Sequence, residues 1–417
     1  MPTTSVAVVG AGQAGLAVSR LLAESGIDHV VLERGQVAER WRSQSWESLR
    51  LLSPNWLTRL PGLAYDGPDR DGFMTAAEVT NLLQAYANAS SAPVIPGADV
   101  VSVRAAGRAY TVVTDAGTWR ANAVVIATGW CAEATLPTSA ASGPRDVEHL
   151  TPSTYRNPQQ VPEGQVVVVG ASASGVQIAD ELARTGRQVT LAAGSHIYLP
   201  RRYRGRDIMW WLEALGELNV PLDPRRDAWA ARSEPSLQLV GAADGRDVGL
   251  AALQDRGIRL AGRLTAIDGR HLVFADDLNA SVGRATARLR RLVRRFDAHA
   301  TSLGRGAEIE PAEPVRPVWL RDRVRRLDLR ADRVSTVIWA TGYQRRYPWL
   351  ELPVLDSAGE IKQVEGRTPA PGLHVIGMHW QTRRSSAFIH GVGHDARLVV
   401  RDIADRLGAS SAEEKAA

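Results

Sequence analysis

The stretch that decides the fold runs from Ser5 to Gly35, SVAVVGAGQAGLAVSRLLAESGIDHVVLERG. An apolar run ends at Gly10, residues at helical spacing follow, and a second apolar run ends at Glu33. Continuous apolar strands on either side of an amphipathic helix are typical of a parallel β-α-β unit whose sheet is covered on both faces. The stretch therefore predicts an α/β fold of the nucleotide-binding type.

The glycines of this stretch have the spacing Gly10-x-Gly12-x-x-Gly15, and Glu33 follows at the end of the second strand. Such glycines permit a tight turn and let a pyrophosphate reach the helix N-terminus, while the acid accepts hydrogen bonds from ribose hydroxyls. A glycine turn without a ligand is the alternative. We favour a dinucleotide site because the motif follows a strand, opens a helix and has its acid in place; its expected contacts also include Gln13, Ala14 and Arg34.

The same pattern returns from Gln165 to Ser195, QVVVVGASASGVQIADELARTGRQVTLAAGS, at an offset of 160 residues when Gly10 is aligned with Gly170. Serine replaces the middle glycine, which keeps the side chain small and adds a hydroxyl. The repeat predicts a second dinucleotide site, and a chain of 417 residues has room for two to three domains at about 150 residues each. The expected contacts in this turn are Gly170, Ser172, Ala173, Ser174 and Gly175.

The second site differs at the end of its second strand. The position that corresponds to Glu33 is Ala193, and four arginines follow between Arg201 and Arg206. No carboxylate repels a ribose 2'-phosphate there, and arginine binds phosphate through two parallel hydrogen bonds. We therefore predict that the second site takes NADPH, with Ser195, Arg201 and Arg202 as contacts; the alternative is that these arginines are solvated or pair with Asp207.

Two further turns have the same composition in both halves. An apolar strand ends on Ala127-Thr128-Gly129 in the first half and on Ala340-Thr341-Gly342 in the second. Small residues at a strand end let the backbone come close to another segment or to a ligand. We include all six residues among the expected cofactor contacts.

Composition excludes several classes of protein. The single cysteine, Cys131, excludes an internal disulfide and a redox pair, and the nine histidines show no metal-ligand spacing. The net charge of +5 comes from arginines interspersed with acids, and an arginine-rich stretch over residues 280–299 has the apolar stripe of a docked helix, so we expect no nucleic-acid partner. No apolar run is long enough to span a membrane and no signal peptide is evident, which predicts a cytoplasmic protein.

The two glycine motifs, the two Ala-Thr-Gly turns and the ending FIHGVGHDARLVV together resemble the flavin-containing monooxygenase-like group of two-dinucleotide-domain flavoproteins. The resemblance covers nearly the whole chain. It implies FAD at the first site and NADPH in an inserted domain, with FAD-binding parts at residues 1–162 and 341–417 and the NADPH domain at 163–340. It also implies flavin contacts from Trp41, Arg42, Ile389 and Gly391.

The monooxygenase group has a linker motif, Phe-x-Gly-x-x-x-His-x-x-x-Tyr, ahead of its second glycine motif. This chain has GPRDVEHLTPSTYRNP, with looser spacing and no matching phenylalanine, which makes His149 and Tyr155 the candidates. Asn55 is a third candidate for a place near the flavin ring, with turn formation after Pro54 as the favoured alternative. These three are the only residues for which we predict a catalytic role.

The resemblance implies a reaction in which NADPH reduces the flavin, oxygen forms a C4a-peroxyflavin, and a small organic substrate is oxygenated at nitrogen, sulfur or carbon, the last by Baeyer-Villiger oxidation. The cofactor supplies the difficult chemistry, so no catalytic triad is required. The alternative is an NADPH-dependent reductase that passes electrons to a partner protein or quinone. The substrate, the type of oxygenation and the oligomeric state, for which a homodimer is one arrangement, stay open.

Overall fold

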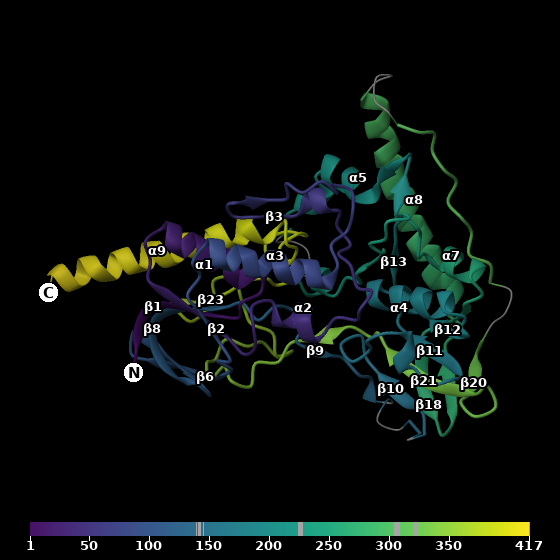
Figure 1. Ribbon diagram of the computed structural model, residues 1–417, viewed down its shortest axis with the longest axis horizontal. Helices are drawn as coiled ribbons and strands as arrows, with labels where there is room; N and C mark the ends of the chain where they lie inside the picture. Colours follow the sequence, from purple (N-terminus) through teal and green to yellow (C-terminus); the bar gives the residue numbers. More distant parts are fainter. Residues whose placement is uncertain are drawn as a thin grey trace.

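The computed structural model describes residues 1–138, 140, 143–144, 146–223, 228–303, 309–320 and 324–416. The chain forms two lobes, each built on one main β-sheet (Figure 1). The beginning and the end of the chain make one lobe, and the middle of the chain makes the other. This arrangement confirms the predicted α/β class with one dinucleotide-binding domain inserted in another.

The first sheet has the strand order β5-β2-β1-β8-β7-β6, with β23 paired to β8. Strand β1 pairs in parallel with β2 and with β8, while β7 pairs antiparallel with both β6 and β8. Because β23 comes from near the end of the chain, the last segment returns to the first domain. The strands are β1 (Thr3–Val9), β2 (His29–Glu33), β5 (Val94–Pro96), β6 (Val100–Ala106), β7 (Ala109–Thr114), β8 (Gly117–Ile126) and β23 (Leu373–Val375).

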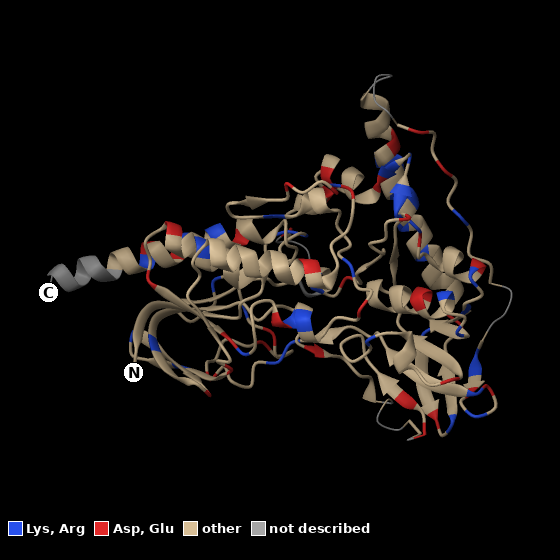
Figure 2. Ribbon diagram, viewed as in Figure 1, with Lys and Arg blue, Asp and Glu red and all other residues tan. Residues whose placement is uncertain are grey.

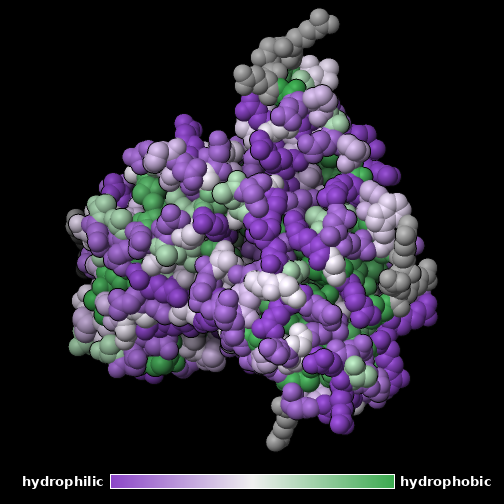
Figure 3. All heavy atoms as spheres, turned by 45° about the vertical axis from the view of Figure 1, so that its right-hand side comes forward, coloured by the Kyte–Doolittle hydropathy of each residue, from purple (hydrophilic) through white to green (hydrophobic). Residues whose placement is uncertain are grey.

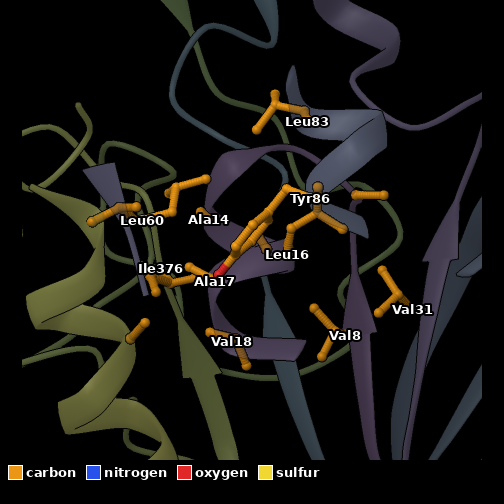
Figure 4. Close-up of a cluster of buried hydrophobic side chains, with 14 of the residues drawn as sticks. Val8, Ala14, Leu16, Ala17, Val18, Val31, Leu60, Leu83, Tyr86 and Ile376 are labelled. Atoms are coloured by element: carbon orange, nitrogen blue, oxygen red, sulfur yellow. The ribbon is translucent and has the colours of Figure 1, made fainter. Parts of the chain in front are cut away.

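Helix α1 (Gln13–Glu24) packs on this sheet, with α3 (Ala76–Ala89) and α9 (Val392–Ala416) beside it. Figure 4 shows Leu16 and Val18 of α1 among Val8, Val31 and Ile376, and all five side chains are fully buried. Each buried side chain of this size contributes about 1.5 to 3 kcal/mol relative to an exposed one. Burial of these side chains therefore holds α1 against the sheet, as the helical spacing of the first stretch predicts.

The second sheet is parallel throughout, with the order β10-β21-β11-β12-β17. Helices α4 (Ala173–Arg184) and α7 (Leu250–Asp255) pack together in this lobe, and α8 (Leu278–Ser302) is the predicted amphipathic helix, which buries Ala285, Leu289 and Phe296. The strands are β10 (Glu148–Leu150), β11 (Gln165–Val169), β12 (Val189–Ala192), β17 (Arg259–Ala261) and β21 (Val334–Trp339).

The second domain is predicted to start at residue 163, and the second sheet also includes an earlier strand. Strand β10 pairs with β21, so residues 148–150 already belong to the second sheet. A strand of three residues has too little pattern to reveal its sheet from sequence alone. The chain crosses between the lobes twice, side by side, where β9 (Glu133–Ala134) and β22 (Tyr343–Gln344) pair antiparallel.

Short elements connect these parts. They are α2 (Glu39–Ser43), η1 (Asn55–Leu57), β3 (Arg59–Leu60), β4 (Leu63–Ala64), η3 (Pro158–Gln160), β13 (Ile197–Tyr198), β14 (Arg202–Tyr203), β15 (Arg206–Asp207), α5 (Ile208–Ala214), η4 (Glu217–Asn219), α6 (Ala228–Arg232), β16 (Leu237–Gln238), β18 (Leu264–Asp268), β19 (His271–Phe274) and β20 (Arg326–Asp328).

Charged residues of both signs are interspersed over both lobes (Figure 2). In the part of the chain that the structure describes, no helix combines the length and the apolar character needed to cross a bilayer. No group of three or more histidine, cysteine or acidic side chains among the described residues is arranged to hold a metal ion.

Candidate cofactor and substrate site

The first cradle is the turn Gly10–Gly15 together with the start of α1, and its backbone is packed too tightly for side chains at two positions. Gly10 has φ of +106°, and a Cβ there would lie 2.8 Å from the carbonyl oxygen of Ala127. A Cβ on Gly15 would lie 1.9 Å from the carbonyl oxygen of Gly10. These contacts explain why the turn needs glycine and why the Ala-Thr-Gly turn of residues 127–129 stands beside it.

Gly12 has a different reason to lack a side chain. No heavy atom lies within 4 Å of a Cβ built on it, so packing does not require glycine there. Gly12 is the N-cap of α1 and offers no side-chain cap, which leaves the first backbone amides of the helix open to a ligand. A helix N-terminus with free amides is a ready site for a pyrophosphate, so the turn fits the diphosphate of FAD.

Glu33 closes the first cradle at the end of β2. One carboxylate oxygen accepts a hydrogen bond from the Ala11 amide at 2.7 Å, and the other accepts one from the Gly35 amide at 3.1 Å. Both amides hold the carboxylate at the end of the strand, where the ribose of a bound dinucleotide would lie.

The second cradle, Gly170–Gly175 with the start of α4, repeats this geometry. Gly170 has φ of +108°, and its Cβ would lie 2.2 Å from the carbonyl oxygen of Ala340. A Cβ on Gly175 would lie 1.9 Å from the carbonyl oxygen of Gly170. Ser172 is the N-cap, and its hydroxyl makes no capping hydrogen bond, so the α4 amides are open as well. The residues present therefore fit a second dinucleotide.

Both cradles open into one cavity of about 1620 Å³ that lies between the two domains. Sites for one small ligand typically measure about 300 to 1000 Å³, so this space is large enough for more than one. The lobes and the notch between them are visible in Figure 3. The predicted contacts that line the cavity are Gly10, Gly12, Gln13, Ala14, Glu33, Arg34, Trp41, Ala127, Thr128, Gly129, Gly170, Ser172, Ala173, Ser174, Ser195, Ala340, Thr341, Gly342 and Ile389.

Six predicted contacts lie outside the cavity lining: Gly15, Gly175, Arg42, Gly391, Arg201 and Arg202. Gly15 and Gly175 act through packing, as described above. The Arg42 guanidinium donates to the carbonyl oxygen of Val37 at 2.9 Å, and Gly391 packs against the Ser385 backbone.

Arg201 has a place that its position in the sequence does not reveal. Its side chain is 2% exposed, lies over the Phe73 ring at 4.8 Å, and donates to the carbonyl oxygen of Leu52 at 2.8 Å. It also forms an ion pair with Asp207. Arg201 therefore joins the two domains in the interior, which matches the alternative of pairing with Asp207 and not a role in binding phosphate.

Arg202 is exposed, and its guanidinium donates to the carbonyl oxygen of Gly205 at 2.7 Å. Arg263, which follows β17, lines the cavity and lies beside Gly194. Arg263 was not among the predicted contacts, because nothing in the local sequence pattern indicates that β17 lies next to β12. The parallel pairing of these two strands is the signal, and it exists only in the folded chain.

The three predicted catalytic residues also lie outside the cavity lining. Asn55 is 5% exposed; its amide donates to the carbonyl oxygen of Asp69 at 2.8 Å and its oxygen accepts from the Met74 amide at 3.1 Å. Both ends of this side chain are therefore engaged in holding the loop, as the alternative of turn formation expects.

His149 and Tyr155 are likewise engaged in packing. The His149 ring accepts a hydrogen bond from the Trp339 indole at 2.9 Å, and the fully buried Tyr155 donates its hydroxyl to the Glu181 carboxylate at 2.7 Å. Burial raises the pKa of Tyr155 well above its ordinary value, so the phenol stays protonated. The linker residues thus stabilise the second domain and do not contact the cavity.

Arg40 of α2 ties the first domain to both crossings. It donates to Gln44 at 2.8 Å and to the carbonyl oxygen of Cys131, and its guanidinium lies over the Tyr343 ring at 4.9 Å. Burial raises the pKa of the Cys131 thiol to about 11, so this cavity residue is a neutral thiol at pH 7.

A third wall of the cavity belongs to neither cradle. We call it the third wall and define it by the lining residues Leu52, Met209, Leu212, Leu218, Phe388 and His390. Two segments from different domains meet there: the Leu222 amide donates to Thr382 at 2.8 Å, and the Arg384 and Ser385 amides donate to Val220 and Leu218 at 3.0 Å. These backbone bonds close that end of the cavity.

The histidines of the cavity are held neutral. Burial lowers the pKa of His390 to about 4 and lowers that of His379, whose ring stacks on Trp130 with ring centres 5.1 Å apart. Neutral rings and apolar side chains make this end of the cavity suited to an uncharged organic molecule.

Comparison with known proteins agrees with this geometry. The family model for pyridine nucleotide-disulphide oxidoreductases matches residues 7–206. A CzcO-like oxidoreductase from Geobacillus kaustophilus is 31% identical over 402 residues, which cover 95% of this chain and 97% of the relative. The single cysteine of this chain excludes the redox pair that disulphide chemistry within one subunit requires.

Two further relatives are named as monooxygenases. Indole-3-pyruvate monooxygenase YUCCA1 of Oryza sativa subsp. japonica is 25% identical over 95% of this chain and 90% of its own length. The solved structure of a flavin-containing monooxygenase from Stenotrophomonas maltophilia matches with a TM-score of 0.66 and 21% identity, over 98% of this chain and 100% of that one. The last match shows the shared two-domain fold.

Proposed function

The chain belongs to the flavin-containing monooxygenase-like family of two-domain FAD/NAD(P)H oxidoreductases, with a CzcO-like oxidoreductase among its relatives, and we propose that it is an FAD-dependent monooxygenase that uses NADPH. Its substrate is a small organic molecule that receives one oxygen atom at nitrogen, sulfur or carbon. The observation that carries the proposal is the cavity of about 1620 Å³ that is lined by both cradles and by the third wall.

The chain's own residues bind the two nucleotides and bring them into one cavity. The open amides at the start of α1 bind the FAD diphosphate and Glu33 binds its ribose, while the amides at the start of α4 hold the NADPH diphosphate. Bound FAD would supply the acceptor for a hydride from the nicotinamide and the activation of oxygen. The protein would hold both nucleotides in the common cavity that the two cradles line.

The third wall binds the substrate and excludes water. Its aliphatic side chains line the cavity, and backbone hydrogen bonds join segments 218–222 and 382–385 beside it. Water exclusion prevents loss of the activated oxygen to solvent. The one titratable ring of the third wall, His390, has a pKa lowered by burial to about 4 and is neutral at pH 7.

The experiment that tests the function follows the oxygen atoms. Holoenzyme, NADPH and ¹⁸O₂ are incubated with methyl phenyl sulfide, N,N-dimethylaniline or cyclohexanone, and products are analysed by mass spectrometry. We expect one ¹⁸O atom in the product of at least one substrate and equal consumption of NADPH. If NADPH oxidation instead yields only hydrogen peroxide, and a quinone is reduced without oxygen at a similar rate, the chain is a reductase and the proposal is wrong.

A further inference from the structure

We propose that Arg263, and not the arginines that follow β12 in the sequence, recognises the 2'-phosphate of NADPH and sets the preference for NADPH over NADH. The inference rests on the proposed function, because it names the residue that selects the nucleotide at the second cradle. It assigns the selection to a strand that carries no part of the glycine motif.

Strand pairing brings Arg263 to the second cradle. Strands β12 and β17 run in parallel with Ala192 opposite Ala261, and the Ala193 amide donates to the carbonyl oxygen of Ala261 at 2.9 Å. Both strands therefore end at the same edge of the sheet. In a fold of this type, the ribose nearest the adenine binds where the strand after the glycine motif ends.

The side chain of Arg263 stands beside that strand end. A Cβ on Gly194 would lie 3.7 Å from the Cγ of Arg263. Arg263, Gly194, Ser195 and Thr265 all line the cavity, and the Arg263 side chain is 69% exposed. The missing side chain of Gly194 thus leaves room for a ribose substituent next to the guanidinium.

The Arg263 guanidinium forms one long ion pair, with Asp277, that a phosphate could replace. The Arg263 backbone is fixed, since its amide donates to Asp277 at 2.9 Å and its carbonyl oxygen accepts from Ala275 at 2.9 Å. Its side chain donates no hydrogen bond to any residue in the described ranges, and the Asp277 carboxylate is 3.7 Å from Nε. A phosphate dianion would offer a stronger, two-point contact than this distant carboxylate.

The groups around Arg263 favour the 2'-phosphate of NADPH over the two ribose hydroxyls of NADH. The position equivalent to Glu33 is Ala193, which is fully buried, so no acid reaches the ribose from that strand. The Ser195 side chain is exposed, lines the same cavity as Arg263 and carries a hydroxyl that can donate to phosphate oxygen. The Nδ1–H of His196 donates to the carbonyl oxygen of Gly194 at 3.0 Å and so fixes the turn.

The test is carried out without oxygen, so that nucleotide selection is measured independently of any later reaction of the reduced flavin. Holoenzyme is mixed anaerobically with NADPH or NADH, and flavin bleaching gives the apparent Kd for each. We expect Arg263→Ala to raise the Kd for NADPH about 10- to 100-fold, as for loss of a hydrogen-bonded charge, and to change that for NADH less than about two-fold. Arg263→Lys should recover part of the loss.

Arg202→Ala is the matched control, because Arg202 is also exposed, follows β12 and lies outside the cavity lining. It should leave both nucleotides unaffected. Calorimetric binding of NADP⁺ and NAD⁺ to the same holoenzymes gives a second measure that needs no reduction. Equal weakening of both nucleotides by Arg263→Ala, or loss of NADPH selectivity in Arg202→Ala alone, would overturn the assignment, whereas failure of oxygen transfer would contradict only the proposed function.

Discussion

The cradle at Gly10 and the cradle at Gly170 use the same contacts at an offset of 160 residues. In both, the first glycine faces an alanine carbonyl of an Ala-Thr-Gly turn, and the last glycine faces the carbonyl of the first. The two cradles differ at the end of the next strand. The Glu33 carboxylate accepts hydrogen bonds from two backbone amides, whereas Ala193 has no side-chain acceptor. The two cradles therefore share the structure of the diphosphate site and differ in the structure of the ribose site.

The difference predicts different fates for the two ligands. A ribose held by a fixed carboxylate suits a cofactor that stays bound, whereas an open edge with an exposed arginine suits a nucleotide that enters and leaves. We therefore expect FAD to be retained through purification and NADPH to exchange in each turnover. The predictions below try to break this contrast, beginning with the largest effect.

Filling the middle position of each cradle should separate the two ligands. Gly12 and Ser172 have φ of −82° and −85°, which valine tolerates, and a Cβ on Gly12 meets no atom within 4 Å. Gly12→Val should therefore fold but raise the Kd for FAD about 100-fold or more, since the side chain occupies the space for the diphosphate. The measurement is the flavin absorbance of purified protein.

The matched variant, Ser172→Val, should keep its FAD and lose reduction by NADPH. Circular dichroism serves as the control for folding in both proteins. Loss of FAD from Ser172→Val, or retention of FAD by Gly12→Val, would contradict the division of labour between the cradles.

Adding a methyl group at the first glycine of each cradle should destabilise the protein. Gly10 and Gly170 have positive φ, and an added Cβ would lie 2.8 Å and 2.2 Å from a carbonyl oxygen. We expect Gly170→Ala to lower the free energy of unfolding by about 2 to 4 kcal/mol and Gly10→Ala by less, since its contact is longer. Urea denaturation of the holoenzymes measures both.

Gly26→Ala and Gly186→Ala are the controls, because these glycines also differ by 160 residues and have positive φ but no atom within 4 Å of an added Cβ. They should show only the smaller backbone effect, alike in both domains. A control as unstable as Gly170→Ala would mean that the contact with the Ala-Thr-Gly turn is unimportant.

Removing the acid of the first cradle should have a smaller effect. Glu33→Ala leaves the Ala11 and Gly35 amides without an acceptor, which costs about 1 to 3 kcal/mol per buried group when no water replaces it. We expect faster FAD loss during dialysis, followed by absorbance. Glu39→Ala is the control, since Glu39 is less buried and accepts one amide hydrogen bond, from Gln36; equal FAD loss in both variants would contradict the role of Glu33.

The smallest expected effect is on the pH dependence of stability, and it tests whether the cavity excludes water around His390. Burial lowers the pKa of His390 to about 4, so between the ordinary value of 6.5 and about 4 the unfolded chain binds a proton that the folded chain does not. Stability should therefore fall as pH falls through this window. Thermal unfolding measured from pH 7 to pH 4 should show a shallower fall in His390→Asn.

His271→Asn is the control for that measurement, because the His271 ring lies at the surface beside Asp328. This variant should keep the steep fall that His390 causes. If His390→Asn and the parent protein have the same pH profile, water reaches that ring and the third wall does not close the cavity.

Much of the molecule could be predicted from local pattern. The two β-α-β units, the glycine turns and the Ala-Thr-Gly turns were located because each depends on residues that are close in sequence and on steric rules for glycine. The prediction of a second, acid-free nucleotide site rests on the same kind of local comparison. Strand β10, which lies ahead of residue 163, was not predicted as part of the second sheet, because it is recognisable only by its pairing with β21.

The candidate side chains were harder to predict. Asn55, His149, Tyr155 and Arg201 are polar groups whose partners come from other segments, and the structure shows that those partners engage them away from the cavity. Arg263 was missed for the converse reason. It is brought to the second cradle by a strand that lies far away in the sequence.

The sequence by itself determined that this chain has two copies of one nucleotide-binding turn, that the second copy lacks an acid, and that one cysteine excludes dithiol chemistry. Only the tertiary structure decided which arginine stands at the second ribose position, where the domain boundary lies, and that both turns open into one cavity. The physical reason is that turn geometry is set by steric contacts within a few residues, whereas the order of strands in a sheet is set by packing between segments distant in the chain.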